Sequence, residues 1–287
     1  MSEYVVDEST IFETPLVEVD LDLEADADVY AKVEWFNLYD APHGGGSIKS
    51  RIAKGMLDGA EERGELEPGV TVIEPTSGNT GSEVARLAAA RGYDVEIVMP
   101  DNAAGGKVEA VRDAGAEIHF AGDEVGHVAV VGTGGTITGT GRGLTDLSDG
   151  AVEVVGFEPD EPLHAIDGLK YLKTGDHYHP ETYDESVLDR TEYVTTADAY
   201  DRARALRERY LDDPVPIADP GQHGEATIRE HLRVDDQFVV GTSAGGGAAV
   251  VANLDAAGDL ADDDVVVFML CDRGDKYADI PLWEDYL

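Results

Sequence analysis

Short apolar runs alternate with longer mixed stretches over much of the chain. Three runs of strand-like composition, at residues 70–74, 95–99 and 116–120, are separated by residues 83–91 and 107–114, whose apolar positions recur at helical spacing. Buried parallel strands show near-continuous apolar runs of this kind, because helices cover the faces of their sheet. The pattern therefore predicts an α/β fold with a mainly parallel sheet in this part of the chain.

The same alternation continues on both sides of this region. Strands are expected at residues 13–17, 29–36, 128–131, 152–158, 237–240 and 265–270, and helices at residues 52–63, 137–144 and 197–210. Gly64, Gly92 and Gly115 each follow an expected helix, as is typical of helix ends.

One connection is too short to lie within a single parallel sheet. Only residues 121–127 separate the strand expected at 116–120 from the one at 128–131, whereas a parallel crossover needs a dozen or more residues. We therefore expect the chain to pass here from one mainly parallel sheet to a second. This predicts a small domain of residues 38–127 and a large domain of residues 1–37 together with 128–287.

Length and apolar content set only broad limits. The chain has 287 residues and is 42% hydrophobic, enough for the core of one large domain or two smaller ones. Its apolar runs are too short to span a membrane, and its first residues lack the basic and apolar regions of a secretory signal. Cys271 is the single cysteine, which excludes an internal disulfide and favours a cytoplasmic location.

Charge changes this picture more strongly. The chain has 60 acidic and 21 basic residues, a formal net charge of −39, and the acidic residues are spread along its whole length. Because molar salt screens repulsion beyond about 3 Å, we interpret the charge as a solvated surface suited to a salt-rich, halophilic cytoplasm. Phosphate contacts need clustered Lys and Arg, so the composition argues against nucleic-acid binding.

The most informative polar stretch is Gly44-Gly45-Gly46-Ser47-Ile48-Lys49-Ser50-Arg51, directly before an expected helix. Glycines let a backbone approach a ligand closely, and a helix start offers unpaired N–H groups. A lysine shielded from water beside an anion site loses its proton more readily and can attack a carbonyl carbon. Taken alone, however, the stretch is better explained as a glycine-rich turn with a solvated lysine.

Two further polar turns each adjoin an expected strand. Gly132-Thr133-Gly134-Gly135-Thr136 places successive N–H groups and hydroxyls before a helix start, which suits a phosphate, although it is not a P-loop. Thr76-Ser77-Gly78-Asn79-Thr80-Gly81 suits a carboxylate and a phenolic oxygen, although helix capping alone explains it better. Ligands bind at the carboxyl ends of strands in open α/β sheets, so these turns are expected to face one cleft.

Together, and in this order, these motifs resemble the cysteine synthase / cystathionine β-synthase family of fold type II pyridoxal-phosphate enzymes. The resemblance continues through Thr14-Pro15-Leu16-Val17, Gly156-Phe157-Glu158-Pro159, His164-Ala165-Ile166-Asp167-Gly168-Leu169, Gly241-Thr242-Ser243-Ala244-Gly245 and Asp272-Arg273-Gly274-Asp275-Lys276-Tyr277. It covers nearly the whole chain. It implies a two-domain, tryptophan synthase β-like architecture with pyridoxal phosphate between the domains, and a homodimer.

The resemblance also implies a role for each motif. Lys49 would be the Schiff-base lysine and, once substrate displaces it, the base that removes the α-proton. Asn79 would bond the phenolic oxygen of the cofactor, and Ser243 the pyridine nitrogen. The phosphate would be held by Gly132, Thr133, Gly134, Gly135 and Thr136, and the substrate carboxylate by Thr76, Ser77, Gly78 and Thr80. No metal site is expected, because His177 and His179 lack a partnered cluster.

The implied reaction is β-replacement on O-acetylserine or O-phosphoserine by sulfide to form L-cysteine, through a Lys49 aldimine and an aminoacrylate. A neutral hydroxyl at the ring nitrogen leaves a weaker electron sink than a carboxylate would, which favours loss of a β-leaving group over transamination. Two alternatives remain open: serine/threonine β-elimination or cystathionine formation, and a homologue that binds the cofactor but is catalytically weakened.

Three departures from the family pattern bear on the second alternative. Ser50 stands where the family usually has Asp after the lysine, and a longer segment than usual joins Asn37 to Gly46. Residues 121–127 replace a long stretch that holds small-domain elements and a substrate-binding glutamine. We therefore expect an intact cofactor site beside a truncated small domain.

Overall fold

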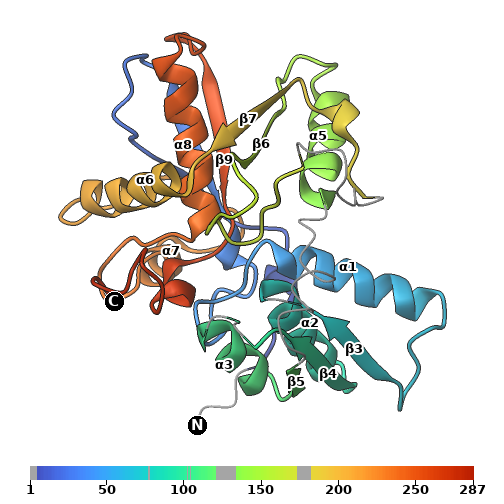
Figure 1. Cartoon of the computed structure of the whole chain (residues 1–287). Helices are drawn as coiled ribbons and strands as arrows, with labels where there is room; N and C mark the ends of the chain where they lie inside the picture. The colour runs from blue at the N-terminus through green and yellow to red at the C-terminus, as the bar shows by residue number, and fades with distance from the viewer. Residues whose placement is uncertain (1–4, 77, 102, 104, 121–133, 173–181) are drawn as a thin grey trace.

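The computed structural model describes residues 5–76, 78–101, 103, 105–120, 134–172 and 182–287 (Figure 1). The strand expected at 128–131 and the short connection at 121–127 lie outside the described residues. No helix of the described ranges is both long enough and apolar enough to cross a membrane.

A four-stranded sheet joins the two ends of the chain. Its order is β8 (Ile217–Asp219), β1 (Leu16–Glu18), β2 (Asp28–Val33) and β9 (Val265–Leu270). β2 and β9 are parallel, with Val33 opposite Leu270, so both strands end at the same edge of the sheet. β1 pairs antiparallel with both β2 and β8, which departs from the parallel arrangement expected for this sheet.

A three-stranded parallel sheet contains β3 (Thr71–Pro75), β4 (Asp94–Met99) and β5 (Glu117–Phe120). Helices α1 (Lys49–Glu62), α2 (Asn79–Ala90) and α3 (Gly105–Asp113) gather around it in the lower half of Figure 1. Val95, Ile97 and Met99 of β4 are buried, whereas Ile73 on the other face is 60% exposed. The central strand thus buries one of its faces, as alternating strand positions allow, whereas both edge strands have no fully buried residue.

A third, two-stranded sheet contains the parallel strands β6 (Val155–Pro159) and β7 (Arg190–Val194). The helices in this part of the chain are α5 (Gly135–Leu147), α6 (Thr196–Arg209), α7 (Glu225–His231) and α8 (Thr242–Ala256). α6 packs against α8, and α8 contacts both β7 and β9. Of the six strand pairs among the described residues, four are parallel, and this alternation of strands and helices confirms the predicted α/β class.

Single-turn 3₁₀ helices complete the described structure: η1 (Glu8–Thr10), η2 (Glu34–Phe36), η3 (Glu185–Val187) and η4 (Gly274–Tyr277). η2 directly follows β2, so the strand expected over 29–36 ends at Val33.

The strand expected at 237–240 was wrong. These residues form only isolated bridges, from Gln237 to Val234 and from Val240 to Arg273, although Phe238, Val239 and Val240 are fully buried. A short apolar run reports burial rather than strand pairing, and here the pairing partners are single residues.

Two helices begin earlier than their apolar patterns suggested. α1 begins at Lys49 rather than at residue 52, and α2 begins at Asn79 rather than at residue 83. Glycine and hydroxyl residues in these first turns carry little apolar signal. Both predicted functional side chains therefore lie at helix N-termini, where backbone N–H groups lack intrahelical partners.

Candidate functional site

The glycine run before Lys49 forms a tightly packed turn. Gly44 and Gly45 have positive φ angles of 92° and 70°, and a Cβ atom on Gly46 would lie 1.4 Å from the carbonyl oxygen of Asn37. All three glycines are buried. Glycine adopts these angles without strain, and only glycine permits the close approach at position 46, so the sequence specifies the shape of the turn and not merely its flexibility.

The turn presents Lys49 beside the end of β9. The Ile48 N–H donates to the carbonyl oxygen of Cys271 at 2.9 Å, and the Lys49 N–H donates to Ser47 Oγ at 3.2 Å. The Lys49 side chain is half-buried, and no hydrogen bond or ion pair to its Nζ is found within the described ranges. Its backbone is therefore held in place while its amine remains available.

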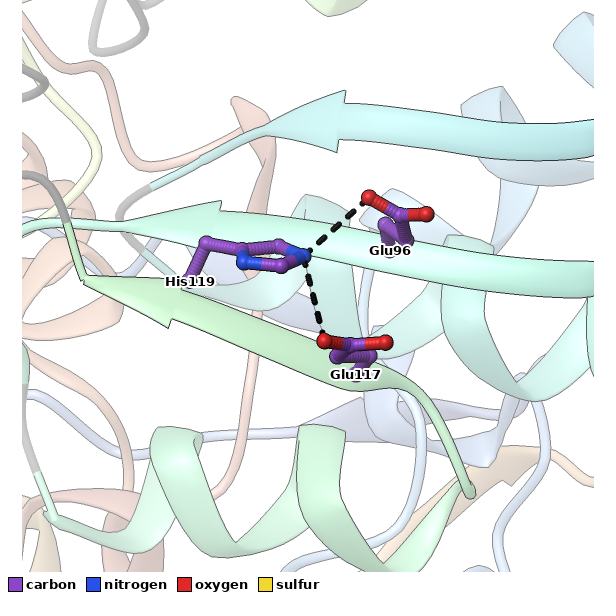
Figure 2. Close-up of side chains that lie close together, drawn as sticks. All are labelled: Glu96, Glu117 and His119. Carbon is purple, nitrogen blue, oxygen red and sulfur yellow. Dashed lines mark hydrogen bonds and ion pairs between the residues drawn. The ribbon is translucent and has the colours of Figure 1, made fainter.

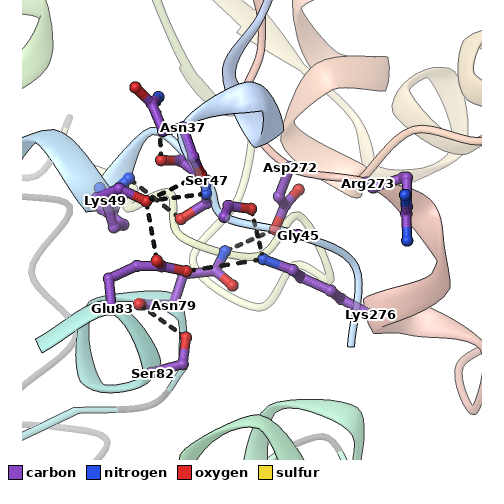
Figure 3. A network of polar contacts seen from close by, with 12 residues as sticks. Asn37, Gly45, Ser47, Lys49, Asn79, Ser82, Glu83, Asp272, Arg273 and Lys276 are labelled. Atoms are coloured by element: carbon purple, nitrogen blue, oxygen red, sulfur yellow. Dashed lines mark hydrogen bonds and ion pairs between the residues drawn. The ribbon is translucent and has the colours of Figure 1, made fainter. Parts of the chain in front are cut away.

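Asn79 and the segment after β9 meet next to this lysine (Figure 3). Asn79 Nδ2 donates to Asp272 Oδ2 at 2.6 Å, and the Tyr277 hydroxyl donates to the same oxygen at 2.6 Å. Asn79 Oδ1 and Asp272 Oδ1 are both buried without a hydrogen-bond partner among the described residues. Buried oxygens of this kind are rare in native proteins, and they leave hydrogen-bond acceptors that a bound group can use.

Ser243 lies in the first turn of α8, and its side chain interacts with Cys271. Burial raises the pKa of the Cys271 thiol to about 11; the hydroxyl of Ser243 and the charge of Lys49 oppose that shift. Cys271 is therefore a protonated, unreactive thiol at neutral pH, as expected for a structural cysteine. The structure brings Lys49, Asn79 and Ser243 together around residues 271 and 272.

Sequence reasoning assigned no role to an ion pair that crosses this region. Lys107 of α3, 3% exposed, pairs with Asp167, and its Nζ lies 4.8 Å from the centre of the Tyr277 ring. A Cβ atom on Gly78 would lie 3.0 Å from the same Nζ, so the ammonium packs directly on the 76–81 turn. Gly78 is thus needed for the close approach of Lys107.

The 76–81 turn is organised by its first threonine. Thr76 Oγ1 accepts the N–H groups of Gly78 and Gly81, each at 3.2 Å, and a Cβ atom on Gly81 would lie 2.1 Å from Thr76 Cγ2. Thr80 is half-buried in the first turn of α2, and Ser77 lies outside the described residues. Thr76 therefore shapes the turn, whatever it contributes to a ligand.

The predicted phosphate turn is described only in part. Gly132 and Thr133 lie outside the described residues. Gly134 has a φ of 65° and stands at the start of α5 with no side-chain cap, followed by Gly135 and the exposed Thr136. A helix N-terminus that follows a left-handed glycine suits an anion.

A separate cluster lies on the exposed face of the three-stranded sheet (Figure 2). His119 Nε2 lies 3.1 Å from Glu96 Oε2 and 3.7 Å from Glu117 Oε1. These donors are close enough together to hold a divalent cation, but their side chains are 38–71% exposed. Such exposure is ordinary for carboxylates with no ligand, so we assign the cluster no function.

Comparison with known proteins agrees with this geometry. A family model described as pyridoxal-phosphate dependent enzyme matches residues 8–127. The chain is 31% identical over 331 residues to a cysteine synthase of Aquifex aeolicus (95% of this chain, 90% of that protein) and 30% identical to cysteine synthase B of Escherichia coli (94% and 93%).

Solved structures show the same fold. An O-ureido-L-serine synthase matches with a TM-score of 0.75 and 23% identity, over 97% of this chain and 95% of that one. An O-acetylserine dependent cystathionine beta-synthase of Helicobacter pylori matches with a TM-score of 0.73 and 20% identity, over the full length of both chains.

Proposed function

The chain belongs to the family of pyridoxal-phosphate dependent enzymes that includes the cysteine synthases, and we propose that it forms L-cysteine from sulfide and an activated serine. The family model and the cysteine synthase relatives support the coarser activity, a pyridoxal-phosphate dependent β-replacement on a serine derivative, and the solved structures support the fold. O-Acetylserine or O-phosphoserine as the serine donor is the finer part of the proposal.

The residues present suit the cofactor. Lys49 offers a half-buried amine with no described partner, and the unpartnered oxygens of Asn79 and Asp272 lie beside it. The hydroxyl of Ser243 lies next to Cys271. We propose that Lys49, Asn79 and Ser243 hold the ring, and that Gly132, Thr133, Gly134, Gly135 and Thr136 hold the phosphate at the start of α5.

Each of these residues then has a definite task. When bound, pyridoxal phosphate supplies the electron sink that stabilises negative charge at the substrate Cα. The Lys49 amine takes the proton from that carbon and is held in reach of it by the buried turn. Thr76, Ser77, Gly78 and Thr80, at the start of α2, are proposed to bind the substrate carboxylate through hydroxyl and N–H groups.

The two sides of this site belong to separate apolar cores. One core joins α1, α2 and β4 through residues such as Leu57, Leu87 and Ile97, and another surrounds the four-stranded sheet. This supports the proposal of a small domain of residues 38–127 and a large domain of the remainder. The Lys107–Asp167 ion pair then joins the two domains across the site, where closure would exclude water.

Two alternatives keep specific support. A cystathionine beta-synthase of Oryctolagus cuniculus is 31% identical over 68% of this chain. This relative keeps cystathionine formation, together with elimination from serine or threonine, as a second candidate. The match of this 287-residue chain extends over 331 residues, so the chain lacks segments that its relative has. That shortening supports the third candidate, a cofactor-binding homologue with weakened activity.

A Lys49→Ala variant tests the proposal in molar salt. The wild type should show the visible absorbance of lysine-bound cofactor and should form cysteine from sulfide with one of the two donors. Lys49→Ala should lose that absorbance and slow the reaction at least about a hundredfold, because it removes the proposed base. Lys54→Ala, on the same helix but paired with Asp58, is the matched control and should retain both.

The outcomes separate the candidates. Bound cofactor with no cysteine from either donor would reject the proposed reaction and favour the weakened homologue. Pyruvate or 2-oxobutyrate from serine or threonine would favour elimination. A wild type that binds no cofactor would end the proposal. The homodimer remains a prediction that sedimentation of the same sample checks.

A further inference from the structure

A buried carboxylate stands behind the Lys49 turn and has no part in the roles assigned so far. Glu83 of α2 is 0% exposed, and Figure 3 shows it between the turn and the segment after β9. Its Oε2 accepts a hydrogen bond from Ser50 Oγ at 2.8 Å, and its Oε1 lies 3.2 Å from Arg86 and 4.0 Å from Lys276 Nζ. One carboxylate thus faces two buried cations.

Both cations hold carbonyl oxygens of the turn. Lys276 Nζ donates to the Gly46 oxygen at 2.8 Å, and Arg86 donates to the Gly45 oxygen at 3.1 Å and the Pro42 oxygen at 2.7 Å. Burial lowers the pKa of Lys276, and the charge of Glu83 opposes that shift. Glu83 is therefore the counter-charge that keeps these donors in the protein interior.

A second chain of contacts leads from Glu83 to Lys49 itself. The Ser50 hydroxyl donates its hydrogen to Glu83, so the lone pairs of Ser50 Oγ are left to act as acceptors. The Ser47 N–H donates to this oxygen at 3.2 Å. Ser47 Oγ in turn accepts the Lys49 N–H at 3.2 Å. The carboxylate thus fixes the hydroxyl orientation on which the first turn of α1 depends.

The same helix carries Asn79 four residues earlier, which places Asn79 and Glu83 on one face of α2. We propose that Glu83 is a positioning residue, which locks the Lys49 turn to α2 and so fixes the distance between the Lys49 amine and Asn79. The inference rests on the proposed function in one respect: Lys49 and Asn79 must hold the same cofactor.

The test measures cofactor attachment at Lys49 rather than turnover. The purified full-length apoprotein is mixed with pyridoxal phosphate, samples are reduced with borohydride over time, and mass spectrometry quantifies the modified Lys49 peptide. Glu83→Gln keeps an acceptor for Ser50 but removes the charge, and should slow attachment at least about tenfold. Glu96→Gln changes an exposed carboxylate instead and should attach at the wild-type rate.

A variant that moves the carboxylate from position 83 to position 50 distinguishes a loss of positioning from a failure to fold. Because Ser50 Oγ lies 2.8 Å from Glu83, an aspartate at position 50 places its charge near the same cations. Ser50→Asp combined with Glu83→Ala should therefore attach cofactor within about threefold of wild type, even where Glu83→Ala alone fails to fold. Wild-type attachment in Glu83→Gln, or slow attachment in a folded double variant, would overturn the inference.

These outcomes are independent of the reaction. A wild type that attaches cofactor at Lys49 but makes no cysteine would reject the proposed reaction and leave the attachment comparison intact. The visible absorbance of the lysine-bound cofactor, measured against pH, adds a second readout. A displaced Lys49 amine should shift the midpoint of this titration in Glu83→Gln, and the midpoint should not shift in Glu96→Gln.

Discussion

Carboxylates gather in two regions of this protein, and the two regions differ in whether water reaches the carboxylate side chains. On the outer face of the three-stranded sheet, Glu96 and Glu117 contact His119 in open solvent (Figure 2). Behind the Lys49 turn, Glu83 and Glu34 form hydrogen bonds of similar length while fully buried.

The comparison shows that the large net charge of the chain and its few buried charges have different physical consequences. A solvated carboxylate interacts weakly with a neighbour because water and salt screen both charges. A buried one that loses its partner retains its full desolvation cost. The net charge of −39 therefore governs how strongly the surface repels itself, whereas Glu34 and Glu83 form hydrogen bonds in the interior around the Lys49 turn.

The largest expected effect comes from Arg51. Its Nε and Nη2 donate to the two oxygens of Glu34 at 2.5 and 2.8 Å, and Glu34 is 0% exposed. Arg51→Ala leaves that carboxylate buried without its cation and should lower the free energy of unfolding by about 3–5 kcal/mol, measured by urea denaturation in molar salt. Adding Glu34→Gln should restore most of the loss. A loss below about 1 kcal/mol in Arg51→Ala would contradict the expected difference between buried and exposed carboxylates.

An intermediate effect is expected at Glu74, a partly buried carboxylate of β3 with no ion pair in the described structure. Burial raises the pKa of Glu74 to about 6 from 4.5. The folded state therefore binds this proton more tightly than the unfolded state. Stability from this group is complete below about pH 4.5 and is lost as pH rises through about 6.

Glu74→Gln removes that titration. At pH 8 it should stabilise the protein by up to about 2 kcal/mol, the equivalent of a pKa shift of roughly 1.5 at 1.36 kcal/mol each. At pH 4 the two proteins should unfold alike. Unfolding curves at both pH values check the prediction, and an equal gap at both would mean that packing rather than charge is responsible.

The smallest effect is expected in the exposed cluster. His119→Ala should change the free energy of unfolding by no more than about 0.5 kcal/mol, because exposed pairs contribute little and molar salt screens them further. Parallel denaturation in low and high salt checks this. A loss of unfolding free energy above about 1.5 kcal/mol that persists in high salt would mean that this cluster stabilises the protein as strongly as the buried carboxylates do.

The sequence located the elements and the motifs well where the signal is local. The last strand spans residues 265–270 as predicted, and the glycines at 44–46 lie in a turn that only glycine permits. The run at 237–240 was misassigned because its apolar side chains report burial, which a strand and an irregular segment share.

The buried charges could not be found in this way. Glu83, Lys107 and Lys276 occupy positions where charged residues usually face solvent, so their burial depends on partners brought close by folding. Ser50 drew attention as a departure from the family pattern, but only the folded chain shows a carboxylate 2.8 Å from its hydroxyl, 33 residues along the chain.

The sequence by itself predicted the α/β class, because that depends on the periodicity of apolar residues. The resemblance of its motifs to a known family identified the cofactor family and singled out Lys49 as the predicted attachment point, because those motifs are made of neighbouring residues. The tertiary structure alone decided which charges are buried and what each one holds. Lys276 reaches the Gly46 carbonyl across 230 residues of chain, and no local pattern encodes a contact of that separation.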